Sequence, residues 1–167
     1  MKIRLSSELQ RDSVVDGEGI RTVIWTQGCP HHCRGCHNPI THSFTGGFLK
    51  DVDELVNEIS QLEFQDGITF SGGDPMMQPE ECTYIAQKCK EMGYNIWCYT
   101  GFLYEELLDD PKKVKFLNYI DVLVDGKFEI DKKSYSAKFR GSSNQRLINV
   151  KASLKKGKAF VFRKYVK

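Results

Sequence analysis

The chain has 167 residues, of which 40% are hydrophobic and 28% are charged, and its formal net charge is +2. This composition is ordinary for a soluble domain, and no apolar run approaches the length that crosses a bilayer, which argues against an integral membrane protein. The first residues, Met1 to Arg4, carry no signal-peptide pattern, so a cytoplasmic protein without a membrane partner is expected.

Two kinds of apolar pattern alternate along the chain. Five short runs bounded by turn residues are predicted to be strands: residues 23–26, 68–70, 96–99, 120–124 and 147–150. Four other stretches carry apolar side chains at helical spacing: residues 52–62, 79–92, 104–108 and 114–119. No repeat or linker divides the sequence, so a single domain over residues 1–167 is the simplest organisation.

The alternation of strands and helices predicts an α/β fold, in which right-handed βαβ units form a mainly parallel sheet. Ligand sites in such folds lie at the carboxyl ends of the strands. Loops with reactive or flexible residues follow four of the predicted strands: residues 29–36, 71–74, 100–101 and 125–127. These loops are therefore expected to converge on one rim and to form a single site there.

The first of these loops carries three cysteines within eight residues, Cys29, Cys33 and Cys36. A [4Fe-4S] cluster normally takes four cysteine ligands, so a set of three would leave one iron open to a substrate. The alternatives are inert thiols and a zinc site completed by a nearby histidine. Because His31 and His32 lie inside the same short loop, tetrahedral ligation by both would be cramped, and the iron–sulfur interpretation is preferred.

The other three cysteines, Cys82, Cys89 and Cys98, fall on predicted apolar faces and are interpreted as core residues, because buried cysteine behaves as a small hydrophobe. Three disulfides are a less favoured interpretation. A chain of this size without an export signal more commonly uses clustered cysteines for metal or redox chemistry.

Two further loops supply candidate ligand contacts. Gly72 and Gly73 follow a predicted strand, where a backbone without side chains can approach a ligand closely, and the carboxylate of Asp74 can accept a hydrogen bond from an ammonium group. Asp125 and Lys127 alternate at the end of another strand, so their side chains are expected on the same side. They form either a surface ion pair or contacts to a zwitterionic ligand.

Three remaining segments have weaker signals. Residues 16–19 (Asp-Gly-Glu-Gly) precede their strand and lack the third glycine of a dinucleotide-binding loop, so that interpretation is rejected. Residues 139–146 contain two arginines and form either an ordinary loop or a recognition surface. Residues 151–167 carry seven basic and no acidic side chains, which indicates a solvated basic tail or a docking segment for an acidic partner or nucleic acid. The apolar residues Phe160, Val161, Phe162 and Tyr165 predict that part of this tail packs on another surface.

The motifs together resemble a known family. Cys29-x₃-Cys33-x₂-Cys36 followed by Gly72-Gly73-Asp74 resembles the radical S-adenosylmethionine enzymes. More narrowly, six segments resemble the activating proteins of anaerobic ribonucleoside-triphosphate reductase: residues 16–21, 28–31, 35–39, 97–101, 121–128 and 139–146. The resemblance covers most of residues 12–150.

Two positions depart from the wider family pattern. Gly35 stands where many radical S-adenosylmethionine enzymes have an aromatic residue, but the reductase activators use glycine there too, so this departure narrows the family. Asp74 replaces the more common glutamate after the glycine pair, and the shorter carboxylate has a shorter reach toward a ligand.

The resemblance implies a short, incomplete (βα) barrel that is open on one side to admit a large substrate protein. It implies a [4Fe-4S] cluster on Cys29, Cys33 and Cys36, and reductive cleavage of S-adenosylmethionine that generates a glycyl radical on the reductase. The residues then expected to contact S-adenosylmethionine are Gly35, Cys36, His37, Gly72, Gly73, Asp74, Asp125 and Lys127.

The same resemblance implies partners. These are the large subunit of anaerobic ribonucleoside-triphosphate reductase and flavodoxin or a similar low-potential electron donor, in an assembly that could be a homodimer or a heterotetramer. No nucleic-acid partner is expected. The alternatives that remain open are an activator of a different glycyl radical enzyme and a zinc-binding interaction module.

Overall fold

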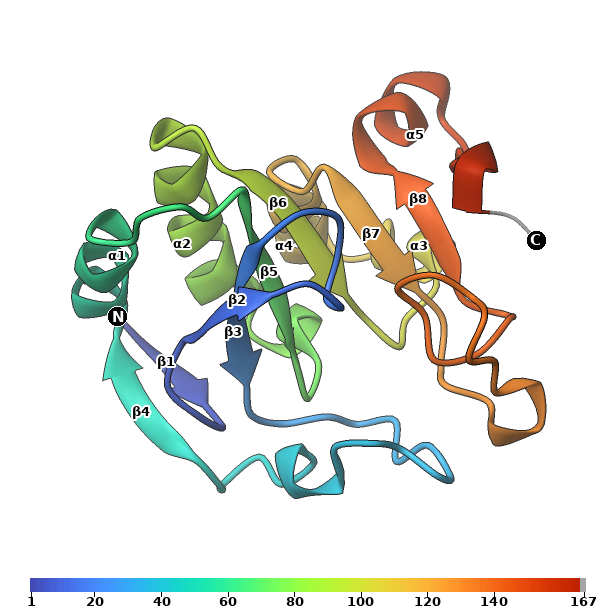
Figure 1. The fold of residues 1–167 in the computed structure, drawn as a ribbon, viewed down its shortest axis with the longest axis horizontal. Helices are drawn as coiled ribbons and strands as arrows, with labels where there is room; N and C mark the ends of the chain where they lie inside the picture. Colours follow the sequence, from blue (N-terminus) through green and yellow to red (C-terminus); the bar gives the residue numbers. More distant parts are fainter. Residues whose placement is uncertain (166–167) are drawn as a thin grey trace.

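The strands form one sheet in the computed structural model, which describes residues 1–165 (Figure 1). In chain order they are β1 Lys2–Leu5, β2 Gln10–Ser13, β3 Arg21–Thr26, β4 Phe48–Asp51, β5 Gly67–Gly72, β6 Asn95–Tyr99, β7 Val122–Asp125 and β8 Arg146–Asn149. The spatial order is β4-β1-β3-β5-β6-β7-β8, with β2 paired to β3. Strands β3, β5, β6 and β7 are parallel, and the outer pairings are antiparallel.

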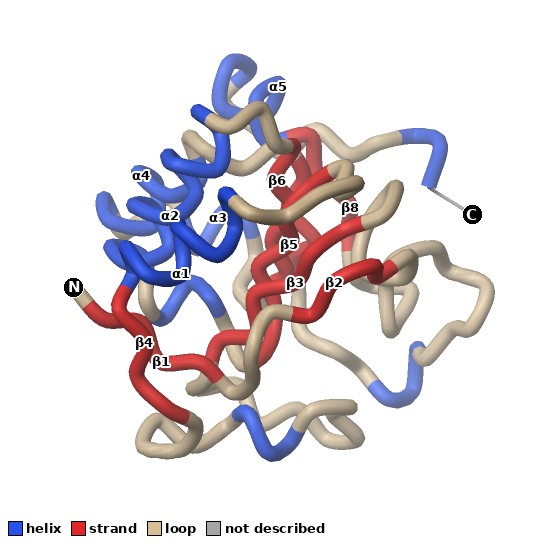
Figure 2. The backbone as a smooth tube through the Cα atoms, turned by 60° about the vertical axis from the view of Figure 1, so that its left-hand side comes forward, coloured by secondary structure: helices blue, strands red, loops and turns tan. Residues whose placement is uncertain are grey.

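The α-helices gather on one face of this sheet, and β2 lies on the other together with long loops that include short 3-10 turns (Figure 2). The α-helices are α1 Val52–Ser60, α2 Pro79–Glu91, α3 Tyr104–Leu107, α4 Pro111–Leu117 and α5 Val150–Lys156. The carboxylate of Asp51 accepts hydrogen bonds from the backbone N–H groups of Asp53 and Glu54, so it caps the start of α1. The expected α/β class with a mainly parallel centre and an unclosed barrel is confirmed.

The alternation of side chains along the strands divides the apolar residues between the two faces. On β6, Ile96 and Cys98 join the large core under the helices, whereas Trp97 belongs to a second, smaller cluster on the opposite face. On β7, Leu123 packs under the helices and Val124 packs on the opposite face. The face away from the helices therefore has its own apolar floor, and it remains available to form a site.

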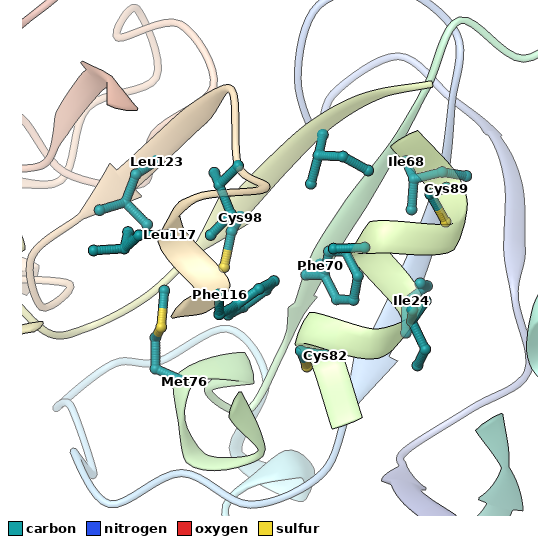
Figure 3. Close-up of a cluster of buried hydrophobic side chains, with 14 of the residues drawn as sticks. Ile24, Ile68, Phe70, Met76, Cys82, Cys89, Cys98, Phe116, Leu117 and Leu123 are labelled. Carbon is teal, nitrogen blue, oxygen red and sulfur yellow. The ribbon is translucent and has the colours of Figure 1, made fainter. Parts of the chain in front are cut away.

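The core under the helices contains the three cysteines that were predicted to be core residues (Figure 3). Cys82, Cys89 and Cys98 are fully buried among aliphatic and aromatic side chains that include Phe70 and Phe116. All six cysteines of the chain are free thiols, as expected for a protein that is not held together by disulfides.

The buried thiols make the fold sensitive to alkali. Burial raises the pKa of Cys89 to about 12 and raises those of Cys82 and Cys98 well above their ordinary value. In the unfolded chain these thiols ionise near pH 8.5, so the unfolded state binds fewer protons and stability falls as pH rises. Between about pH 9 and 10 we therefore expect the free energy of unfolding to fall, with Cys89 alone contributing about 1 kcal/mol to the fall.

Urea unfolding under reductant at a series of pH values measures this slope. The Cys89→Ala variant should show a slope smaller by about 1 kcal/mol per pH unit, because the contribution of this thiol is removed. A slope equal to that of the wild type would mean that Cys89 does not contribute.

The strands that the sequence did not predict, β1, β2 and β4, have four residues each, and at least half of the residues in each are polar. Strand β2 is mostly exposed, and β1 and β4 pair with each other at one edge of the sheet. Strand β8 is antiparallel to β7, so the last predicted strand does not extend the parallel series. The chain then returns along β8: the backbone N–H of Phe162 donates to Leu147 O, and Val161 and Phe162 pack on the two apolar clusters. This confirms that part of the basic tail is packed, and the surface it packs on is the domain itself; the side chain of Tyr165 lies outside the described residues.

Within residues 1–165, no helix has both the length and the apolar character needed to cross a membrane.

Candidate functional site

The carboxyl ends of β3, β5, β6 and β7 lie at one edge of the sheet, and the loops expected to carry the chemistry meet there (Figure 1). A cavity of about 420 Å³ opens on the helix-free face at this edge. Its floor is formed by Trp25, Ser71 and Tyr99, one from each of three neighbouring strands. Its walls come from Val15, Asp16, Cys36, His37, Asn38, Phe128, Phe139, Arg140, Gly141 and Gln145.

The cysteine loop leaves β3 and runs along this edge. The backbone N–H groups of Gly28 and Cys29 donate to Thr41 O and His42 O, which fixes the start of the loop against the following turn. Cys29 is buried, and Cys33 and Cys36 are half-buried. Gly35 between them has φ +76°, a left-handed conformation that a side chain would strain.

The thiols of this loop are close enough to influence one another. Burial raises the pKa values of the Cys29 and Cys33 thiols, and neighbouring thiol groups raise them further. In the described residues, no three His, Cys, Asp or Glu side chains are arranged to hold a metal ion. The donor set still fits an iron–sulfur cluster, because three free thiols stand on one loop beside a cavity that Cys36 lines.

The histidines near this loop differ in their contacts. The ring of His37 packs against Phe128 at the cavity wall, with 5.1 Å between the ring centroids. His31 is directed instead to Asp74. His42, which the sequence did not single out, has its Nε2 3.4 Å from the Cys36 sulfur, and its pKa is lowered by burial. No sequence signal distinguishes His42. It lies six residues after Cys36, and the two side chains meet only because the chain turns back between them.

The glycine pair allows close approach of two backbone segments. The N–H of Gly73 donates to Thr26 O, and the N–H of Asp74 donates to Gly28 O. A Cβ on Gly72 would lie 2.2 Å from Thr26 O, and one on Gly73 would lie 2.4 Å from Gly28 O. The glycines are therefore required for packing of β5 against the start of the cysteine loop, whatever ligand they also contact.

We expect Gly73→Ala to lower the free energy of unfolding by about 3 kcal/mol, because the new Cβ would overlap backbone atoms that cannot rotate away. Urea unfolding measures the loss. Hydrogen exchange at the Asp74 amide should also accelerate, since its bond to Gly28 O is displaced. Gly93→Ala is the control: nothing lies within 4 Å of its Cβ, so only the cost of its φ of +90°, about 1 kcal/mol, is expected. Equal losses in the two variants would contradict the close-packing argument.

Asp74 is fully buried, and its carboxylate accepts several hydrogen bonds from the protein. The Thr100 hydroxyl donates to both carboxylate oxygens at 2.9 Å. The backbone N–H groups of Gly101 and Met76 donate at 2.9 and 3.0 Å. Asp74 therefore joins the loops after β5 and β6, two of the four loops that were expected to meet.

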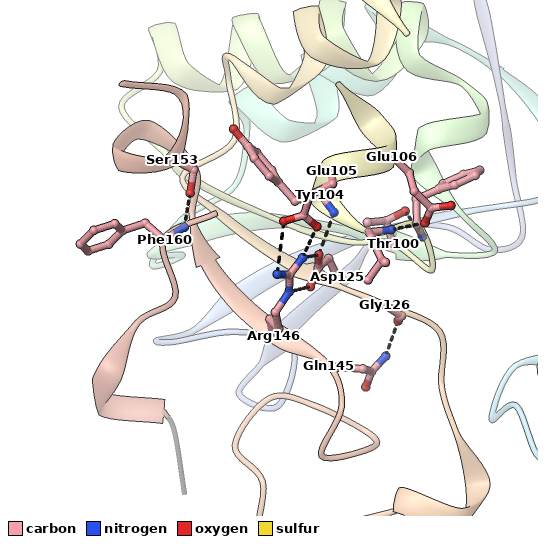
Figure 4. A network of polar contacts seen from close by, with 12 residues as sticks. Thr100, Tyr104, Glu105, Glu106, Asp125, Gly126, Gln145, Arg146, Ser153 and Phe160 are labelled. Carbon is pink, nitrogen blue, oxygen red and sulfur yellow. Dashed lines mark hydrogen bonds and ion pairs between the residues drawn. The ribbon is translucent and has the colours of Figure 1, made fainter. Parts of the chain in front are cut away.

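Asp125 is also fully buried, and it is paired with Arg146 (Figure 4). Two guanidinium nitrogens of Arg146 donate to its two oxygens at 3.0 and 2.5 Å, and the N–H of Tyr104 donates at 2.8 Å. Lys127 lies beyond the end of β7 and is exposed, so the two side chains do not alternate on one strand as expected. The charge of Lys127 nevertheless acts on Cys33, whose thiol pKa it lowers against the larger effect of burial.

The segment at residues 16–21 has a structural role that its glycine pattern did not reveal. Arg21 is 1% exposed and donates to the Thr69 hydroxyl and the Asn95 carbonyl, among other acceptors, so it joins the starts of three strands. A Cβ on Gly17 would lie 2.8 Å from the Arg21 side chain. This structural role of residues 16–21 agrees with the rejection of a dinucleotide-binding loop in this segment.

The segment at residues 139–146 forms one wall of the cavity. The Tyr99 hydroxyl donates to Phe139 O at 2.7 Å, and the Gln145 side chain accepts from Gly141 N and Ser142 N. A larger cavity of about 640 Å³ lies at the opposite end of the parallel strands. We assign the site to the smaller cavity, because the cysteine loop borders it and none of the cysteines borders the larger one.

Comparisons with known proteins agree with an iron–sulfur site at the cysteine loop. Residues 15–148 match the family model of the 4Fe-4S single cluster domain, which supports iron–sulfur over zinc at the cysteine loop. A crystal structure of QueE from Escherichia coli superposes with a TM-score of 0.50 at 15% identity, covering 60% of this chain and 53% of that chain. This likeness concerns the fold alone.

Three relatives with higher sequence identity to this chain are anaerobic ribonucleoside-triphosphate reductase-activating proteins. The protein from Pasteurella multocida is 36% identical over 141 residues, covering 79% of this chain and 89% of the relative. The proteins from enterobacteria phage T4 and Escherichia coli K12 are 37% and 36% identical, covering 80% and 79% of this chain and 86% and 90% of the relatives. The chain belongs to the family of anaerobic ribonucleoside-triphosphate reductase-activating proteins.

Proposed function

We propose that this chain is a radical S-adenosylmethionine enzyme that generates a glycyl radical on the large subunit of an anaerobic ribonucleoside-triphosphate reductase. The observation that carries the proposal is the position of the three-cysteine loop, at the rim where four parallel strands end and beside a cavity on the open face. The names of the relatives support the identity of the target.

Cys29, Cys33 and Cys36 would hold a [4Fe-4S] cluster. When bound, such a cluster supplies the electron for reductive cleavage of S-adenosylmethionine. Because burial keeps the pKa values of the Cys29 and Cys33 thiols above their ordinary value, these thiols must lose their protons when metal binds. Loading is therefore expected to be favoured by higher pH.

The other candidate residues would hold and orient S-adenosylmethionine. Gly72, Gly73 and Asp74 border the cysteine loop and are proposed to lie at the methionine amine. Gly35, Cys36 and His37 would form the wall nearest to the cluster, and two of these line the cavity. Trp25 and Tyr99 on the floor offer aromatic surfaces that exclude water from the bound nucleoside.

Asp125 and Lys127 are proposed to serve the carboxylate end of S-adenosylmethionine in different ways. The exposed ammonium group of Lys127, which acts electrostatically on Cys33, would attract the carboxylate. Asp125, whose oxygens are bound by Arg146, would act indirectly by fixing the end of β7 from which Lys127 extends.

The open face and the free thiols support the remaining assignments. The cavity lies on the face away from the α-helices, which supports the approach of a protein segment that transfer of a radical to another chain requires. Six free thiols fit a reducing compartment, so we propose a cytoplasmic location and flavodoxin or a similar low-potential carrier as the electron donor. A homodimer or a heterotetramer with the reductase is the proposed assembly.

The test mixes the reconstituted chain with S-adenosylmethionine, dithionite and the reductase large subunit without oxygen, and records electron spin resonance. A glycyl radical signal is expected, with none when the radical-forming glycine of the large subunit is replaced by alanine. Cleavage of S-adenosylmethionine without this signal would point to another glycyl radical enzyme as the target. A colourless protein that binds only zinc after reconstitution would favour the interaction module instead.

A further inference from the structure

His31 connects the cysteine loop to the loops that follow β5 and β6. Its Nε2 lies 2.6 Å from Oδ2 of Asp74, and the two side chains are 6% and 0% exposed. Its ring meets the Phe102 ring edge-on, with 4.6 Å between the centroids. A Cβ on Gly101 would lie 2.4 Å from the His31 ring, so the residue after Thr100 must be small for the histidine to reach the carboxylate.

The hydrogen bond from His31 differs from the others that Asp74 accepts. The donors from Thr100, Gly101 and Met76 belong to the loops after β5 and β6, which the sheet already holds in place. His31 is the donor that comes from the cysteine loop. A buried carboxylate is stabilised by each such bond, and a buried hydrogen bond to a charged group is stronger than a neutral one.

We infer that His31 is a positioning residue, which ties the cysteine loop to Asp74 and so fixes the three thiols relative to that carboxylate. The inference rests on the proposed function, in which the thiols hold the cluster and Asp74 lies at the methionine amine. The side-chain hydrogen bond adds to the backbone bond from Asp74 N–H to Gly28 O, and loosening it is expected to affect the loop and the ligand contact together.

Three variants test the role of the hydrogen bond between His31 and Asp74. His31→Leu removes the donor and keeps a bulky side chain, whereas His31→Gln keeps an amide N–H that can reach Asp74. His32→Asn is the matched control: it removes the neighbouring imidazole, for which no hydrogen bond to a carboxylate exists among the described contacts. Asparagine also tolerates the φ of +49° at that position.

The first measurement is hydrogen exchange of residues 29–36 in the full chain before cluster loading. We expect His31→Leu to accelerate exchange in this loop by about tenfold, the effect of losing one buried charge-assisted bond. Exchange in β3 and β5 should stay at the wild-type value, which also shows that the variant is folded. His31→Gln should restore most of the protection, and His32→Asn should leave it unchanged.

The second measurement is the kinetics of S-adenosylmethionine cleavage by the loaded protein. For His31→Leu we expect the KM for S-adenosylmethionine to rise about tenfold and kcat to fall much less, because the ligand contact loses its placement while the cluster remains. A purely structural residue would lower the active fraction and leave KM unchanged. Return of KM toward the wild-type value in His31→Gln would support positioning through the hydrogen bond.

The inference is overturned if loop exchange in His31→Leu matches the wild type, or if His32→Asn accelerates it equally. It is also overturned if His31→Gln rescues neither exchange nor KM. The exchange experiment does not depend on S-adenosylmethionine chemistry. If His31→Leu accelerates loop exchange as expected but the wild type forms no glycyl radical, the proposed function is wrong, whereas the positioning of the loop by the His31–Asp74 hydrogen bond is supported.

Discussion

Replacement of Cys33 by alanine is expected to give a folded protein that holds no complete cluster and does not cleave S-adenosylmethionine. Cys33 is half-buried on the loop, outside the apolar core, so its loss removes a metal ligand and little packing. With two thiols left, a [4Fe-4S] cluster would lack protein ligands on two of its irons. Iron content after anaerobic reconstitution should fall from about four per chain to less than about one. Cys29→Ala and Cys36→Ala should behave alike.

The control is Cys89→Ala, which also removes one thiol but from the core under the helices. It should lose about 1 kcal/mol of stability and retain the iron content and the brown colour of the wild type. Iron, sulfide and visible absorbance measured side by side separate the two sets of variants. A Cys33→Ala protein that retained a full cluster and full cleavage activity would show that the three-cysteine assignment is wrong.

Replacement of Asp125 by alanine is expected to lower the free energy of unfolding by about 3 kcal/mol. The carboxylate is fully buried, and its removal leaves the buried N–H of Tyr104 without an acceptor and Arg146 with its outer partner only. That partner is Glu105, whose Oε1 accepts from the same guanidinium at 2.7 Å but whose side chain is 56% exposed (Figure 4). Urea or thermal unfolding measures the loss.

Glu105→Gln is the matched control, because it weakens the exposed half of the same network and should cost less than about 1 kcal/mol. Arg146 lowers the pKa of Glu105. The stability from this pair is therefore present above the unfolded pKa near 4.3 and is lost as pH falls through the lower folded value. If Asp125→Ala and Glu105→Gln proved equally mild, the buried pair would not stabilise the end of β7 as we argue.

The parts of the fold that the sequence predicted are those in which burial leaves a periodic pattern. Residues 96–99 sit between two covered faces, and the helix from Pro79 shows its apolar stripe directly. Strand β2 has no such pattern, since three of its four residues are exposed and it forms by pairing with β3. Strand β3 begins at Arg21, a charged residue that is buried because neighbouring strands supply its acceptors.

The site shows the same division. The cysteine spacing and the glycine pair were visible because the chemistry and the backbone approach each require particular residue types. The partner of Asp125 could not be predicted from the sequence, because it depends on the register between two strands. Strand β8 runs antiparallel to β7 and places Arg146 opposite Asp125. The contact of His31 with Asp74 spans 43 positions and becomes visible only when the ends of β3 and β5 are brought together.

The direction of β8 determines at which end of the sheet α5 lies. A strand of that polarity delivers its following segment, α5, to the end of the sheet remote from the cysteines. The segment after α5 turns back along β8, and Phe162 and Lys164 border the larger cavity at that remote end. The reactive rim is therefore built by the connections after β3, β5, β6 and β7, and α5 lies away from it.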